Sequence, residues 1–231
     1  MPQEELAKIM DYLATKSRIL FLTTSNRWAG EKGGEQPKST QLAYKMQEKL
    51  GVNKVELIDV TRLIIYPCEG NVSTERGNTC GLKEALLADP EKNPSGLHRC
   101  WASLNNPDDE LWKISKKLFN SDCVMFFASV RWGQTNSFYQ RLIERLTWIE
   151  NRHSTLQEEN VVHAIDAGLI LLGQNWRGAE VLATQERVLS YFGFNTVPEL
   201  FWHWQFTTPD DESPDSYKNA AEEFQRLLAN F

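Results

Sequence analysis

Hydroxyl, amide and guanidinium groups are concentrated in the segment TTSNRWAGEKGGEQPKST, residues 23–40. The segment follows the apolar run RILFL (18–22), which is typical of a buried strand, and it is longer than most connections. Ser39 and Thr40 stand at the start of an expected helix, where unpaired N–H groups and the helix dipole favour a dianionic phosphate. Arg27 would add a positive charge. Ser and Thr are also preferred helix caps, so both roles remain open.

Other residue patterns that carry chemistry are absent from the sequence. The spacing C-x₁₁-C-x₁₉-C at Cys68, Cys80 and Cys100 lacks the short C-x₂-C run of iron–sulfur sites. Cys123 is expected to be a small buried hydrophobe. The histidines show no paired metal spacing, and we expect His163 and His203 to lie at strand ends with satisfied hydrogen bonds. The sequence therefore predicts no metal site.

Two further enzyme classes are excluded by motif. The run GEKGG (30–34) is not followed by Gly-Lys-Ser/Thr, so it is not a nucleotide-binding P-loop. Neither Ser25 nor Ser129 lies in a Gly-x-Ser-x-Gly elbow, which argues against an α/β-hydrolase.

The composition is that of an ordinary globular protein. The chain has 231 residues, 41% of them hydrophobic, and a net charge of −6, which argues against nucleic-acid and anionic-membrane partners. No apolar run approaches the ~20 residues that span a bilayer, and the N-terminal residues predict an amphipathic helix rather than a signal peptide. We expect a cytoplasmic protein with free thiols.

Strand and helix patterns alternate along the chain. Strands are predicted at 18–24, 54–60, 122–129, 163–173 and 196–206. Helices are predicted at 1–16, 38–51, 108–119, 134–150, 178–193 and 216–231. This alternation predicts a single α/β domain over 1–231, with a doubly wound five-stranded parallel sheet and an irregular insertion at about 61–108. With strand order 2-1-3-4-5, the loops 23–40, 129–133 and 173–178 meet where the order reverses, which is where such folds bind ligands.

Four stretches occur in order with the expected elements between them: ILFLTTSNR…STQLA, VELIDVTRLIIYPC, DCVMFFASVRWGQTNSFYQRLIERL and LILLGQNWRGAEVLATQERVLSYFGF. Together they resemble the flavodoxin-like NADPH-dependent FMN reductases, a family that includes quinone reductases and iron–sulfur flavoproteins. The resemblance covers roughly residues 18–195. It implies a flavodoxin-like fold and FMN as cofactor.

The resemblance also assigns residues to parts of FMN. The phosphate would be held by Ser25, Arg27, Ser39 and Thr40, with Gln41 beginning the helix. The ribityl chain and ring would lie beside Ser129, Val130, Arg131, Trp132, Gly133 and Gln134. The far ring edge would meet Gly173, Gln174, Asn175, Trp176 and Arg177. The chain departs from the family in two places: the first loop is longer, and SVRWG stands where the family usually has PVYWG, so that Arg131 replaces a Tyr.

The function implied is an FMN-dependent NAD(P)H oxidoreductase that passes electrons to a quinone, flavin or similar small-molecule acceptor. The chemistry would occur at flavin N5, so no catalytic side chain is expected. The absence of a Gly-x-Gly-x-x-Gly turn favours FMN over FAD. The resemblance also implies a homodimer or homotetramer. Two alternatives stay open: an FMN-binding electron carrier or ligand sensor without NAD(P)H turnover, and a flavin-free scaffold.

Overall fold

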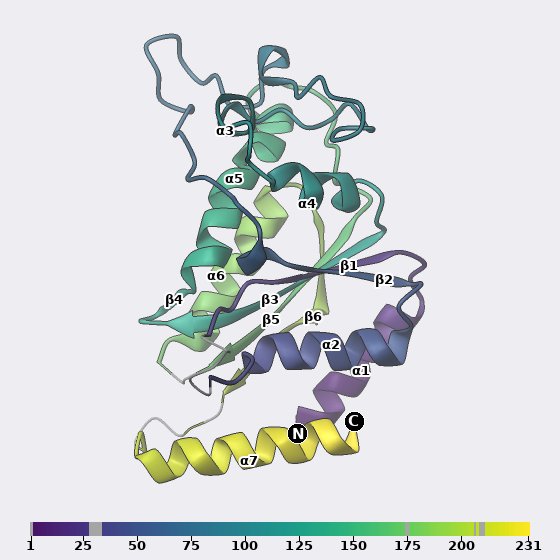
Figure 1. The fold of residues 1–231 in the computed structure, drawn as a ribbon, viewed down its shortest axis with the longest axis vertical. Coiled ribbons are helices and arrows are strands. Elements are labelled where there is room, and N and C mark those ends of the chain that lie inside the picture. The colour runs from purple at the N-terminus through teal and green to yellow at the C-terminus, as the bar shows by residue number, and fades with distance from the viewer. Residues whose placement is uncertain (1, 28–33, 174–175, 206, 208–210) are drawn as a thin grey trace.

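The computed structural model describes residues 2–27, 34–173, 176–205, 207 and 211–231, and Figure 1 shows the whole fold. The strands are β1 (Ile19–Thr23), β2 (Val55–Asp59), β3 (Cys123–Arg131), β4 (Gln134–Thr135), β5 (Asp166–Gly173) and β6 (Asn195–Gln205). The α-helices are α1 (Pro2–Ala14), α2 (Lys38–Leu50), α3 (Trp101–Asn105), α4 (Leu111–Leu118), α5 (Ser137–Ser154), α6 (Gly178–Tyr191) and α7 (Pro214–Asn230). Two short 3₁₀ helices are η1 (Val60–Arg62) and η2 (Lys83–Ala85).

Five strands form a parallel sheet in the order β2-β1-β3-β5-β6, and the short β4 pairs antiparallel with β3. This confirms the predicted doubly wound α/β fold, since β5 and β6 are the fourth and fifth predicted strands. Thr23 pairs with Phe127 across β1 and β3, and Ser129 pairs with Leu172 across β3 and β5. The carboxyl ends of these three strands therefore share one edge of the sheet.

Helices cover both faces of the sheet (Figure 1). α1, α2 and α7 cover one face, and α4, α5 and α6 cover the other. Alternate residues of each strand enter different cores: Leu20 packs with the α4–α6 side, and Phe21 packs with the α1–α7 side. All five residues of β1 are buried, which explains its continuous apolar run. Within the part of the chain that the structure describes, none of the helices has the length and apolarity to cross a membrane.

Two predicted helix starts were wrong. Gln134 and Thr135 form β4 instead of the first turn of α5, because a tight turn at Trp132 and Gly133 folds the chain back onto β3. The helix begins at Ser137, after Asn136, whose side chain accepts the N–H of Tyr139 and so caps it. The other helix begins at Leu111 rather than at 108.

A buried polar network joins residues 61–110 to α5. Arg145 and Asp109 form an ion pair, with Nη1–Oδ2 at 2.6 Å and Nη2–Oδ1 at 3.0 Å, and both side chains are fully buried. Ser103 Oγ accepts from Arg145 Nη2 at 2.9 Å and donates to Asp109 Oδ1 at 2.8 Å. His98 bonds Ser103 through Nε2 and Ser115 through Nδ1, at 3.0 and 2.8 Å. The network fixes this long segment to the domain.

The donors in this network specify the protonation of His98. Because the Ser103 hydroxyl hydrogen goes to Asp109, Ser103 can only accept from His98 Nε2, and Nδ1 is left to accept from Ser115. The ring is therefore neutral with the proton on Nε2. Burial, together with the charge of Arg145, lowers the pKa of His98 to about 4, and Asp109 opposes the shift.

Candidate functional site

The loops that leave β1, β3 and β5 line one cavity of about 350 Å³ at the carboxyl edge of the sheet. Of the residues that the sequence predicts for the site, its lining contains Ser25, Arg27, Ser39, Ser129, Val130, Arg131 and Gly173. Asn26, Pro37, Lys38, Leu172 and Tyr217 complete the lining. Residues far apart in the chain thus meet at the predicted place, as the topology requires.

The N-terminus of α2 presents two buried hydroxyls without partners. Ser39 and Thr40 are each 2% exposed, and neither Oγ makes a hydrogen bond within the described residues. The N-cap residue is Pro37, and no side chain caps the helix, so the alternative role of these residues as caps is wrong. A buried hydroxyl left unpaired costs about 1–3 kcal/mol. A phosphate at this helix terminus would accept from both hydroxyls and from the unpaired N–H groups.

Positive charge gathers at the same helix terminus. Arg27 is exposed and lies 3.5 Å from Glu35, a loose pair that leaves its guanidinium available to an anion. Lys38 is the first residue of α2 and lines the cavity. Burial lowers the pKa of Lys38 and Arg27 lowers it further, while Glu35 acts in the opposite direction. A bound dianion would stabilise the charged form of Lys38. The sequence analysis missed this residue, although it immediately precedes the Ser39–Thr40 pair.

Asn136 holds together the loops that follow β1 and β3. The sequence analysis missed this residue as well. Its Nδ2 lies 3.3 Å from Thr24 Oγ1, 3.4 Å from Ser25 Oγ and 3.4 Å from Ser129 Oγ. Its backbone N–H donates to Ser129 O at 3.0 Å, and its Oδ1 caps α5. One amide side chain therefore fixes Ser25 and Ser129 relative to each other. An Asn directly before an apolar helical pattern was the available signal.

The β3–β4 hairpin carries an exposed tryptophan on a constrained backbone. Trp132 has φ +50° and is 90% exposed, and Gly133 follows with φ +68°. A β-carbon on Gly133 would lie 3.2 Å from Trp176 Cζ3 and 3.3 Å from Arg177 Cδ, so the loop after β5 packs directly on this glycine. A non-glycine residue in the left-handed region is uncommon and clusters at functional sites.

A second cavity, of about 300 Å³, lies at this hairpin. It is lined by Val130, Arg131, Trp132, Gly133, Trp176 and Glu212. Arg131 therefore lines both this cavity and the 350 Å³ one. Gln174 and Asn175 lie outside the described residues. Glu212, which precedes α7, was not anticipated from the sequence. The hairpin cavity offers two flat aromatic surfaces and charges of both signs.

Gln41 is engaged away from these cavities. Its Nε2 donates to Gln36 O at 2.7 Å, and its Oε1 accepts from Gln225 of α7 at 3.1 Å. Its backbone N–H donates to Pro37 O. The side chain of Gln41 thus ties α2 to α7 and lines neither the 350 Å³ cavity nor the hairpin cavity.

His203 packs under the loop that follows β5. A β-carbon at Gly178, the first residue of α6, would overlap its imidazole. Burial lowers the pKa of His203, and its Nε2 has no hydrogen-bond partner among the described residues, so the expectation of a satisfied His203 was wrong. His163 lies ahead of β5, and its Nδ1–H donates to Asn160 O of its own loop at 2.7 Å.

The cysteines take no part in these cavities. All four are free, and burial raises the pKa of Cys80 and of Cys123 to about 12, which suppresses thiolate formation. Among the described residues no group of three or more His, Cys, Asp or Glu could hold a metal ion.

Three solved structures share this fold. RosB, solved with bound 8-demethyl-8-formylriboflavin-5′-phosphate, has a TM-score of 0.58 at 15% identity, covering 91% of this chain and 73% of RosB. Smu.1420 from Streptococcus mutans UA159 has a TM-score of 0.52 at 10% identity, covering 92% and 100%. An NAD(P)H:quinone oxidoreductase from Methanothermobacter marburgensis has a TM-score of 0.50 at 12% identity, covering 93% and 96%.

These similarities establish a flavodoxin-like fold, as the sequence predicts. At identities this low, the comparisons show the fold alone. No protein-family model matches the chain, and no curated protein matches its sequence.

Proposed function

We propose that the protein is an FMN-dependent NAD(P)H oxidoreductase that passes electrons to a quinone, a flavin or a similar small acceptor. One observation carries the proposal: the buried, unpaired hydroxyls of Ser39 and Thr40 at the N-terminus of α2, beside a cavity lined by the loops of three strands. Such a pair fits a phosphate group, and the 5′-phosphate of riboflavin is present in the ligand of RosB. The fold shared with a quinone oxidoreductase supports the reaction class.

In this proposal each part of the site has a separate task. Ser39, Thr40, Arg27 and Lys38 bind the phosphate, and Asn136 keeps the two loops beside it in register. Trp132 and Trp176 provide apolar surfaces for planar molecules. Bound FMN would accept hydride from a reduced nicotinamide and deliver two electrons to the acceptor, so the protein needs no nucleophile of its own.

The decisive experiment is flavin binding followed by reduction. Purified protein, reconstituted with FMN where necessary, should bind FMN more tightly than ~10 μM, about 7 kcal/mol. NADPH should then bleach the flavin absorbance, and a quinone should restore it. Failure to bind FMN discards the proposal. A bound flavin that dithionite reduces but NADPH does not would identify the electron carrier instead.

We further propose that the protein works as a homodimer or homotetramer. The support is the exposure of Trp132 beside the hairpin cavity, since an aromatic side chain this exposed is typical of an interface. Light scattering on the wild type and on Trp132→Ala tests it: a monomeric wild type contradicts the proposal.

A further inference from the structure

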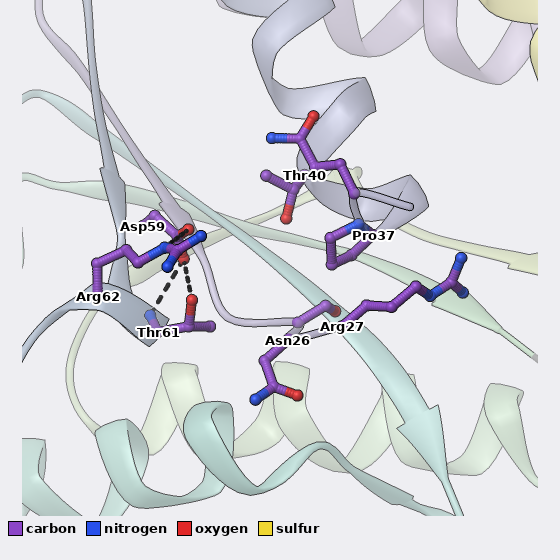
Figure 2. A pocket seen from close by; sticks show the side chains of 9 residues that line it. Asn26, Arg27, Pro37, Thr40, Asp59, Thr61 and Arg62 are labelled. Atoms are coloured by element: carbon purple, nitrogen blue, oxygen red, sulfur yellow. Dashed lines mark hydrogen bonds and ion pairs between the residues drawn. The ribbon is translucent and has the colours of Figure 1, made fainter. Parts of the chain in front are cut away.

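The two unpaired hydroxyls at α2 face different cavities. Ser39 lines the 350 Å³ cavity beside β3 and β5, whereas Thr40 lines a larger cavity of about 540 Å³ on the opposite side of β1. Figure 2 shows the Thr40 hydroxyl directed into the space between Arg62 and Arg27. Ser25, Asn26, Arg27 and Pro37 line both cavities, so the first loop separates them. The proposed FMN phosphate lies at the end of α2 between the two cavities and uses both hydroxyls, which leaves Asp59 and Arg62 of the second cavity without a ligand.

The second cavity pairs a carboxylate with a guanidinium at the carboxyl end of β2. Asp59 Oδ1 accepts from the N–H and the hydroxyl of Thr61, at 3.1 and 2.7 Å, which fixes the carboxylate. Its other oxygen lies 3.6 Å from Arg62 Nε. The Arg62 side chain is 79% exposed and makes no other ion pair among the described residues, so its terminal nitrogens face the cavity and solvent (Figure 2).

This donor and acceptor set matches a ribose phosphate. A carboxylate accepts from the vicinal hydroxyls of a ribose, and a guanidinium donates two parallel hydrogen bonds to a phosphate. In dinucleotide folds, an acidic residue after the second strand of a β-α-β unit binds the ribose hydroxyls, and a neighbouring Arg accommodates a ribose phosphate. Asp59 and Arg62 hold these positions relative to α2, and the cavity volume lies in the usual range for small-ligand sites.

We propose that this cavity is a nucleotide subsite, in which Asp59 binds the ribose hydroxyls and Arg62 binds the phosphate. The inference rests on the proposed function, because the neighbouring ligand is taken to be FMN. A ribose phosphate here has two sources: the adenylate half of FAD, continuous with a flavin in the first cavity, or a separate nucleotide such as NAD(P)H.

Calorimetric titration of FMN-saturated, full-length protein with 5′-AMP tests the subsite. We expect saturable binding of AMP without release of FMN, and at least tenfold weaker binding of adenosine, which lacks the phosphate. Arg62→Gln should weaken AMP tenfold or more and change the FMN dissociation constant less than twofold. Asp59→Asn should also weaken AMP; its amide oxygen can still accept from the Thr61 N–H, so the turn is kept. The matched control is Arg76→Gln, which replaces an exposed arginine within 61–108. It should change neither the affinity for AMP nor the affinity for FMN.

The remaining outcomes separate the two sources and the two proposals. FAD binding tenfold tighter than FMN to the flavin-free protein, with the gain lost in Arg62→Gln, assigns the subsite to FAD. Equal affinities for FAD and FMN, together with a raised KM for NAD(P)H in Arg62→Gln, assign the subsite to a separate nucleotide. AMP that fails to bind, that displaces FMN, or that binds Arg62→Gln as well as the wild type overturns the inference. AMP binding that depends on Arg62 in a protein that cannot bind FMN keeps the subsite and discards the proposed function.

Discussion

The network around Arg145 and the N-terminus of α2 both bury polar side chains, but the network pairs its polar atoms within the chain, with the exception of Arg145 Nε. Both terminal nitrogens of Arg145, both oxygens of Asp109 and both ring nitrogens of His98 have partners. Ser39 and Thr40, just as deeply buried, have none among the described residues. A buried polar group with a partner stabilises the folded state, whereas one without a partner costs free energy until a ligand forms a hydrogen bond with it. Burial alone therefore does not identify a site, whereas buried polar groups that lack partners and line a cavity do.

This comparison predicts that substitutions in the two regions change different quantities. Substitutions at α2 should change ligand affinity and leave folding nearly unaffected. Substitutions in the Arg145 network should do the reverse.

The largest effect is expected for Ser39→Ala combined with Thr40→Val. Each hydroxyl that donates to a charged phosphate is worth roughly 1.5–3 kcal/mol, so FMN should bind about 10²–10⁴-fold more weakly. Riboflavin, which lacks the phosphate, should bind almost unchanged, and the flavin-free variant should melt no lower than the wild type. Fluorescence titrations with both flavins measure this.

Thr23→Val is the matched control for that double variant. Thr23 Oγ1 is also buried and unpaired among the described residues, but Thr23 lines none of the three cavities at this edge of the sheet. Its substitution should leave FMN affinity unchanged. Equal weakening of FMN and riboflavin by the double variant would show that the hydroxyls do not touch phosphate.

Asp109→Ala is expected to have the next largest effect, and on stability. Removing one partner of a buried ion pair leaves an uncompensated charge and costs about 3–5 kcal/mol. Burial alone would raise the pKa of Asp109, but the Arg145 guanidinium, with the Tyr66 N–H and the Ser103 hydroxyl, more than offsets it and the pKa is lowered. Urea unfolding should show the loss of stability in Asp109→Ala, whereas the affinity for FMN should change less than threefold. Asp108→Ala, which removes an exposed carboxylate that accepts from Tyr66, should change stability by less than about 1 kcal/mol.

The pH dependence of stability follows from His98. Its pKa is about 4 in the folded protein and 6.5 in the unfolded chain, so the unfolded state binds the proton more readily. The stabilisation is complete above pH ~6.5 and is lost as the pH falls towards 4, by up to about 3 kcal/mol. His98→Gln should flatten this part of the profile, and the exposed His163→Gln should not. Superimposable profiles for His98→Gln and the wild type would contradict the assignment.

The sequence predicted the features that depend on periodicity and topology. Continuous apolar runs such as 18–22 identified the parallel strands, and the strand order brought Ser25, Ser129 and Gly173 to one cavity. The contacts of Asn136 with Ser25 and Ser129 could not be predicted, because they depend on a turn at Trp132 and Gly133 that has no apolar periodicity. The sequence also could not tell a capping hydroxyl from an unpaired one at Ser39, since that depends on Pro37 taking the cap position.

The smallest expected effect belongs to Arg131, where the resembling family usually has a Tyr. Arg131 is exposed at the end of β3, lines two cavities and makes no ion pair among the described residues, Glu144 included. If its guanidinium lies near flavin N1–C2=O, it stabilises the negative charge that appears on reduction. A unit charge ~4 Å away contributes about 1 kcal/mol in water and about 4 kcal/mol at an effective dielectric of 20. For a two-electron couple this is roughly 20–90 mV, and the exposure of Arg131 favours the lower end.

Arg131→Ala should therefore lower the two-electron potential of bound flavin by about 20 mV or somewhat more, with FMN affinity nearly unchanged. Arg131→Lys keeps the charge and should restore most of the potential, which separates electrostatics from packing. Potentiometric titration against reference dyes measures all three proteins. A potential that is the same in wild type and Arg131→Ala, with FMN bound in both, would show that the arginine only extends into solvent. The hairpin would then contribute only its aromatic surfaces to the site. The polar contacts with the ligand would come from the buried hydroxyls at the N-terminus of α2.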